Sequence, residues 1–110
     1  MNGDTLRRLA ALSGAVAVAA GAYGAHGATG EAAEWLRTGA TYEMVHAVAV
    51  LALALVGAAG IGAWLLLGGS VVFAGTLYAM ALGAPHILGA VTPLGGLAMI
   101  VGWLLVAFRR

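Results

Sequence analysis

The side chains best placed to do chemistry within this sequence are a carboxylate and an imidazole, Glu43 and His46. Residues three apart on a helix share one face, so the two groups would act together. The Glu-x-x-His spacing is that of di-metal carboxylate bundles, but those repeat the motif and add two further carboxylates. Glu43 is the single acidic residue of the long apolar stretches, so a closed di-metal site would have too few ligands.

Three interpretations of Glu43 and His46 remain open. The pair could hold one metal ion together with His26 or His86, since imidazole is a ligand for several divalent metals. It could also relay a proton. We favour a third interpretation, in which both residues lie near the outer end of their helix and hydrogen-bond to neighbouring helices, because polar groups buried in a membrane bundle need partners. This predicts a polar intramembrane cluster without a metal or other cofactor, formed by Glu43, His46, His26, Tyr23, Tyr78 and Thr76.

The elements that must position these residues are membrane-spanning helices. Of the 110 residues, 63% are hydrophobic and 8% are charged, whereas a soluble domain has about 25% charged residues. The mean hydropathy is +1.02. Residues 6–23, 42–59, 63–82 and 87–108 form four apolar stretches, each about as long as a transmembrane helix. A barrel would need alternating polarity, which these stretches lack. We predict an all-α integral membrane protein with one four-helix domain over residues 1–110, and no enzymatic activity.

The N-terminal stretch has a second interpretation, because paired arginines, an Ala-rich run and small residues also describe a secretory signal peptide. Its removal would leave three spans, so we keep it as the first helix.

The connection from Gly24 to Ala40 is the one that carries charges. Thr29 can cap a helix whose first turns contain Glu31 and Glu34, in agreement with the helix dipole. We expect a short amphipathic helix on the membrane surface, with Trp35 and Leu36 dipping into the headgroups. A solvated loop is the alternative.

The start of the last helix is ambiguous at Thr92-Pro93. Proline is common in the first turn of a helix, so the helix could begin there and leave Ile87–Val91 as a non-helical segment. The alternative, which we favour, is one continuous helix from Ile87 with a kink at Pro93.

The basic residues predict the topology. Arg7, Arg8, Arg109 and Arg110 flank the two ends, and only Arg37 lies elsewhere. Positive residues mark cytoplasmic segments, so we expect a bacterial inner-membrane protein with both termini in the cytoplasm. The net charge of +1 gives no basic surface for nucleic acid. The absence of cysteine excludes disulfides and thiolate chemistry.

Small residues spaced four apart predict where helices approach each other closely. Ala17, Gly21 and Ala25 form such a ridge on the first helix. Gly75, Ala79 and Gly83 form one on the third, and Ala98 and Gly102 one on the fourth. We expect Gly21 and Gly75 to face neighbouring helices and Leu66 to face lipid.

Five segments resemble the signature blocks of the DUF423 family, also called UPF0382, which a human transmembrane protein 256 resembles too. They are Gly21–Gly27 (GAYGAHG), Tyr42–Ala47 (YEMVHA), Phe73–Tyr78 (FAGTLY), Leu88–Gly96 (LGAVTPLGG) and Gly102-Trp103. The resemblance spans nearly the whole chain and implies a four-helix inner-membrane protein, but no activity. Members commonly carry Gln at the position of Glu43, which implies that the site does not depend on a titrating carboxylate.

Three functional classes are compatible with these features. The chain could be a structural or accessory subunit of a membrane assembly, which its small size and close-packing ridges favour. It could bind or carry a lipid, quinone or other small amphiphile at its polar cluster. It could also be a small proton-coupled transporter that works as an oligomer. The expected partners are the lipid bilayer and either further copies of the chain or a larger membrane complex.

Overall fold

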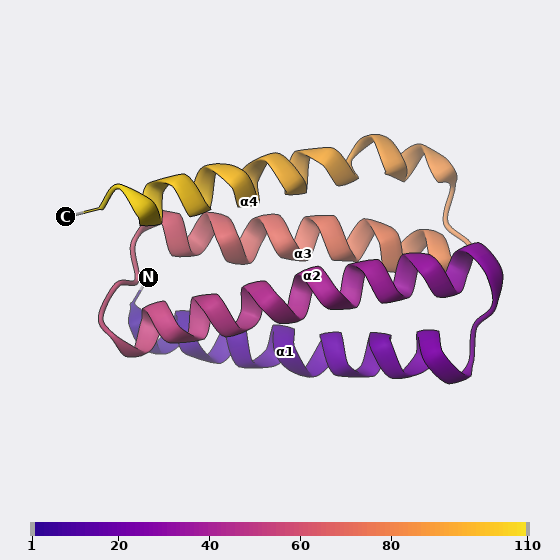
Figure 1. Ribbon diagram of the computed structural model, residues 1–110, viewed down its shortest axis with the longest axis horizontal. Coiled ribbons are helices and arrows are strands. Elements are labelled where there is room, and N and C mark those ends of the chain that lie inside the picture. Colours follow the sequence, from indigo (N-terminus) through magenta and orange to yellow (C-terminus); the bar gives the residue numbers. More distant parts are fainter. Residues whose placement is uncertain (1, 110) are drawn as a thin grey trace.

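Four long helices run side by side along the molecule (Figure 1) in a computed structural model that describes residues 2–109. They are α1 (Gly3–His26), α2 (Gly30–Leu55), α3 (Ile61–Ala81) and α4 (Thr92–Ala107), and a short 3-10 helix, η1 (His86–Ala90), precedes α4. The expected all-α four-helix bundle is confirmed. Each helical span is long and apolar enough to cross a membrane, with η1 and α4 together forming the fourth.

Consecutive helices are antiparallel, and each packs on the next in chain order. α1 also touches α3, so the row is curved rather than flat. The two ends of the described chain lie at the same end of the bundle (Figure 1). Leu6, Ala10, Val50 and Leu66 are almost completely buried in a core that joins α1, α2 and α3.

The second helix is longer than expected, and the separate surface helix is wrong. Residues 30–40 continue without a break into the rest of α2. Leu36 is 3% exposed rather than dipping into headgroups, since it packs against Gly24 of α1. An added Cβ at Gly21 would lie 3.5 Å from the Ala40 Cβ, which shows how closely this part of α2 follows α1. Thr29 precedes the helix as expected, but its side chain makes no capping hydrogen bond.

The fourth span is neither of the two expected forms. A 3-10 helix covers His86–Ala90, and an α-helix starts at Thr92 with Pro93 in its first turn. The expected kinked α-helix from Ile87 is therefore wrong, because proline is accommodated at a helix start at no hydrogen-bond cost. The Thr92 hydroxyl accepts or donates a hydrogen bond of 2.6 Å with Thr76 of α3, which fixes this start against its neighbour.

Four glycines bring the backbones of α3 and α4 into close contact. Gly62 lies opposite Gly102, and Gly69 lies opposite Gly95. An added Cβ at Gly95 would lie 2.5 Å from the Phe73 backbone nitrogen and 2.6 Å from the Gly69 oxygen. Dispersion contacts between backbones hold helices together in lipid, so these glycines allow α3 and α4 to pack closely.

The predicted packing residues are correct only in part. Gly21 faces α2 and Gly102 faces α3, as expected. Gly75 meets open space, so its expected contact with a neighbouring helix is wrong. Gly83 is not a packing residue but has a φ of +107° in the turn after α3.

Leu66 and Ala25 also depart from the predicted packing. Leu66 is fully buried, although we expected it to face lipid. Ala79 is half-buried, and Ala25 at the end of the α1 ridge is exposed. The spacing of four was misleading on α3, because Ala and Gly are frequent throughout the chain, whereas on α4 it identified Ala98 and Gly102, which both meet α3. The contacting glycines are instead seven apart on both α3 and α4.

Candidate functional site

Glu43 lies in the middle of α2 and connects three helices. Its Oε2 accepts a hydrogen bond of 2.7 Å from the Ser13 hydroxyl of α1, and its Oε1 accepts one of 2.7 Å from the Tyr78 hydroxyl of α3. Glu43 is 4% exposed. Because α2 begins at Gly30, Glu43 is about 20 Å along the axis from the start of α2. The expected position near the outer end of the helix is therefore wrong.

The Tyr78 ring reaches Glu43 because α2 has a glycine where the ring crosses it. A Cβ at Gly39 would lie 2.6 Å from Cε1 of the Tyr78 ring. Tyr78 is in the last turns of α3, and helical side chains tilt toward the helix N-terminus. This tilt points the hydroxyl back along α3 to the level of Glu43. Gly39 and the direction of α3 together position the phenol.

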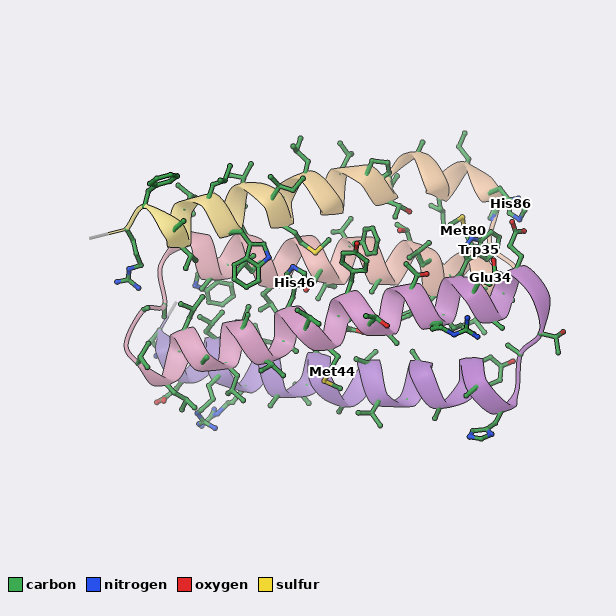
Figure 2. All side chains as sticks on the ribbon, in the orientation of Figure 1. Glu34, Trp35, Met44, His46, Met80 and His86 are labelled. Carbon is green, nitrogen blue, oxygen red and sulfur yellow. The ribbon has the colours of Figure 1, made fainter. Side chains whose placement is uncertain are left out.

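His46 connects α2 to α4, and its hydrogen bonds define its tautomer. The Trp103 indole Nε1 donates to His46 Nε2 over 3.0 Å. Indole N–H is only a donor, so Nε2 carries no proton. Nδ1 lies 2.7 Å from the Tyr42 carbonyl oxygen, and therefore carries the proton and donates it. His46 is thus a neutral imidazole with both ring nitrogens engaged, and Figure 2 shows it projecting from α2 into the bundle.

Two of the residues that complete this cluster were not identified from the sequence. Ser13 is 6% exposed in an Ala-rich helix, and Trp103 ends the last signature segment. The only available signal for Ser13 was that a hydroxyl in a long apolar stretch needs a partner. For Trp103, the signal was an indole N–H in the fourth apolar stretch, where a donor needs an acceptor.

The other expected members of the cluster lie elsewhere. Thr76 bonds to the Phe73 carbonyl and to Thr92, not to Glu43. Tyr23 and His26 are exposed at the end of α1. His86 packs edge-on against Trp35, with ring centroids 5.2 Å apart, at the end of the bundle remote from His46 (Figure 2). The structure therefore unites Glu43 with Tyr78, and His46 with Trp103, and separates the rest.

This arrangement gives no support to a metal centre. Within residues 2–109, no three His, Asp or Glu side chains are grouped so that they could hold an ion. The same residues contain no buried side-chain nitrogen or oxygen without a hydrogen-bond partner. The polar groups of the interior satisfy one another.

A groove of about 450 Å³ lies beside the cluster, between α1 and α3. Ser13, Glu43 and Tyr78 are its polar residues, and the rest of its lining is apolar. The apolar lining comprises Leu9, Leu12 and Val16 of α1 with Trp64, Leu67, Gly68, Val71 and Gly75 of α3. Gly68 and Gly75 have open space where a Cβ would be. The groove therefore combines an apolar wall with a carboxylate at its polar side.

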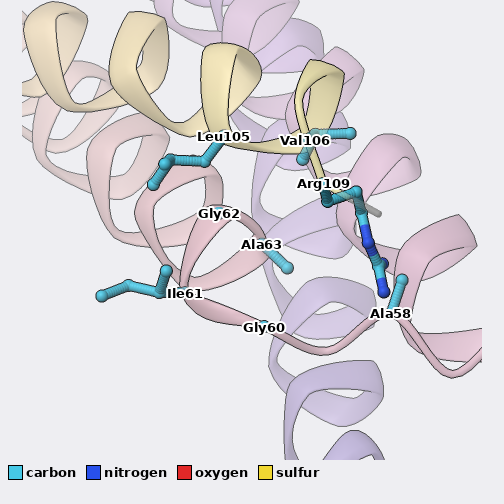
Figure 3. Close-up of a pocket in the computed structure, with 8 residues that line it drawn as sticks. All are labelled: Ala58, Gly60, Ile61, Gly62, Ala63, Leu105, Val106 and Arg109. Carbon is cyan, nitrogen blue, oxygen red and sulfur yellow. The ribbon is translucent and has the colours of Figure 1, made fainter.

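A second pocket, of about 250 Å³, lies at the end of the bundle that holds both termini (Figure 3). The turn from Ala58 to Gly62 lines it on one side, and Leu105, Val106 and Arg109 line it on the other. Arg109 is exposed, and its guanidinium group extends over the turn (Figure 3). This pocket is separate from the Glu43 cluster.

A family model described as "Protein of unknown function (DUF423)" matches residues 20–96. The match includes Glu43, His46 and Tyr78, and it leaves Ser13 and Trp103 outside. No solved structure matches the chain.

Several curated relatives are membrane proteins by name. A UPF0382 membrane protein of Haemophilus influenzae is 38% identical over 71% of this chain and 67% of the relative. The UPF0382 membrane protein YwdK of Bacillus subtilis is 40% identical over 63% of this chain and 62% of the relative. The UPF0382 inner membrane protein YgdD of Escherichia coli is 39% identical over 66% of this chain and 60% of the relative. The chain thus spans about three fifths to two thirds of these relatives' lengths.

Proposed function

Because the chain belongs to the DUF423 family of membrane proteins, we propose that it acts as a non-catalytic structural or accessory subunit of a membrane assembly. The observation that carries this proposal is the closure of its interior polar network. Glu43 is engaged by Ser13 and Tyr78, and His46 by Tyr42 and Trp103. Partners from α1, α3 and α4 hold Glu43 and His46 against the neighbouring helices, as expected of residues that stabilise a membrane bundle.

The outer surface of the bundle supports the same proposal. Large apolar side chains are exposed along all four helices, among them Leu12, Val48, Val72 and Leu104. Such a surface suits lipid and the helices of a membrane partner equally well.

The orientation we propose places both termini in the cytoplasm of a bacterium. Arg7 and Arg109 lie at the same end of the bundle, where both ends of the described chain are found. Arg110, the last of the basic residues that predict this topology, lies outside the described residues. Positive charge is enriched on the cytoplasmic side of inner-membrane proteins.

Purification from native membranes tests the accessory role. A tagged chain extracted in mild detergent should migrate on a native gel as a complex with a stoichiometric partner. Glu43→Gln should retain that partner, because glutamine keeps an acceptor oxygen for one of the two hydroxyls. Gly95→Leu should lose it, because a leucine cannot fit between α3 and α4. A wild-type chain that migrates alone would contradict the proposal.

A second function, binding of a small amphiphile, is favoured by the groove between α1 and α3. Ligand sites are concave and mostly apolar, with a few polar groups that orient the ligand, and have volumes of roughly 300–1,000 Å³. The groove of about 450 Å³ has these properties, and its polar groups are Ser13, Glu43 and Tyr78.

A further inference from the structure

Glu43 is the acidic residue that lines the groove between α1 and α3, and its hydrogen-bond partners indicate which kind of head group the groove could hold. Both hydrogen bonds that the carboxylate receives come from neutral hydroxyl groups, those of Ser13 and Tyr78. Neither hydroxyl carries a positive charge, so these contacts include no cation that could pair with the carboxyl group. An ionised group within a bilayer is costly unless an opposite charge pairs with it.

The nearest imidazole cannot supply that opposite charge. His46 accepts the indole N–H of Trp103 at Nε2, so protonation of Nε2 would set two donors against each other. Arg37, the basic residue on the same helix, is about 9 Å nearer the helix start along the axis. A cation that pairs with Glu43 therefore has to come from outside these groups.

The groove offers such a cation a way to the carboxylate. Glu43 is among the lining residues, and the apolar wall extends from it along Leu12 and Val16 of α1 and Val71 of α3. The open space at Gly68 and Gly75 widens the groove on the α3 side. An apolar body could occupy this wall while a small head group reaches Glu43.

We propose that this groove binds an apolar molecule carrying one protonated amine, with the ammonium group donating hydrogen bonds to Glu43. The proposal rests on the amphiphile-binding function above and adds the chemistry of the head group. An ammonium group is compact and presents several donors, so it can use the acceptor positions that Ser13 and Tyr78 leave free. The position of Glu43 deep in α2 favours a single-chain amine over a phospholipid, whose head group stays at the membrane surface.

The test uses the whole chain in phosphatidylcholine nanodiscs and three probes with the same brominated dodecyl chain. The probes end in an amine, an alcohol or a carboxylate. Trp64 lines the groove, so a bromine atom there should quench its fluorescence, and Trp64→Phe identifies its share of the signal. We expect saturable quenching by the amine, with about a tenfold preference over the alcohol, because charge-assisted hydrogen bonds are roughly twice as strong as neutral ones.

Two variants separate the charge of the site from its shape. Glu43→Gln should reduce the preference for the amine over the alcohol to about none, while its thermal stability stays close to that of the wild type. Gly75→Leu should abolish saturable quenching by both probes, because it fills the open space in the groove. Ala107→Leu adds three carbons at an exposed position of α4, away from the groove, and should change neither measurement.

The possible failures can be told apart. Equal, saturable binding of amine and alcohol that Gly75→Leu blocks would overturn the ammonium proposal and leave amphiphile binding intact. No saturable quenching by any probe would overturn both. A wild-type dimer in native mass spectrometry that Gly75→Leu converts to a monomer would show that a second copy fills the groove, and would overturn both as well.

Discussion

Adding a single methyl group at Gly95 should weaken the bundle, whereas the same addition at Gly75 should not. At Gly95 the new Cβ would lie 2.5 Å from the backbone nitrogen of Phe73, 2.6 Å from the Gly69 oxygen and 3.0 Å from the Phe73 Cα. All three atoms belong to the α3 backbone, so no side-chain rotation can relieve the contact. The two helices would have to separate by roughly 1 Å to restore a normal separation of about 3.5 Å.

The magnitude follows from comparing the two substitutions. Gly→Ala within a helix gains up to about 1 kcal/mol of helix propensity, and this gain is common to both positions. Overpacking costs about 1–3 kcal/mol and applies to Gly95 alone, because nothing lies within 4 Å of a Cβ at Gly75. Gly95→Ala should therefore have a lower free energy of unfolding than Gly75→Ala by about 1–3 kcal/mol.

Unfolding in mixed micelles, followed by circular dichroism as the fraction of denaturing detergent rises, measures this difference. Gly102→Ala is a second test of the same interface, since its Cβ would lie 2.9 Å from the Gly62 oxygen. Equal stability of the Gly95 and Gly75 variants would refute the assignment of the glycines to the α3–α4 contact. A loss of stability confined to Gly75→Ala would instead restore the packing predicted from the spacing of four.

The remaining predictions concern the polar cluster and the topology. Glu43→Leu should lower the free energy of unfolding by about 1–3 kcal/mol, because it leaves the hydroxyl of Tyr78 without its acceptor. In thermal unfolding, Glu43→Gln should lose little stability. Equal losses for both variants would contradict the hydrogen-bonding role of Glu43. Trp103→Phe removes the donor to His46 and should cost about 0.5–1.5 kcal/mol in the same assay; an unchanged stability would mean that this bond contributes nothing. A reporter enzyme that is active only in the cytoplasm should be active when fused after Arg109, whereas one that is active only in the periplasm should be inactive. Activity of the periplasmic reporter would reverse the proposed topology.

The hydrogen bonds of the interior explain how so few polar residues can connect all four helices. Ser13 and Tyr78 join α1 and α3 to the same carboxylate on α2, and Trp103 joins α4 to His46 on α2. Each bond therefore connects a different helix to α2. In lipid, where apolar surfaces gain little from contacting each other rather than acyl chains, such bonds help define which helices are neighbours.

The composition by itself determined the solvent and the class of fold. With 63% hydrophobic and 8% charged residues, the chain has too little polar surface for water. Backbone groups in lipid must be satisfied within each segment, so the apolar stretches had to be helices. The lengths of the stretches predicted four of them, and the structure confirms this number among residues 2–109. The need of Glu43 for partners could also be predicted, because an acidic residue amid apolar ones is costly.

Which residues meet was decided only by the tertiary structure. In a soluble helix, the contrast between apolar and polar faces indicates the side that packs, but here both faces are apolar because lipid and protein interior have the same chemistry. Leu66 could therefore not be told from a lipid-facing leucine, nor Gly95 from Gly75. The continuity of α2 from Gly30 was missed for a related reason. The charges of residues 31–37 indicated a position on the membrane surface. The structure instead buries Leu36 against α1, and these residues form the first turns of α2.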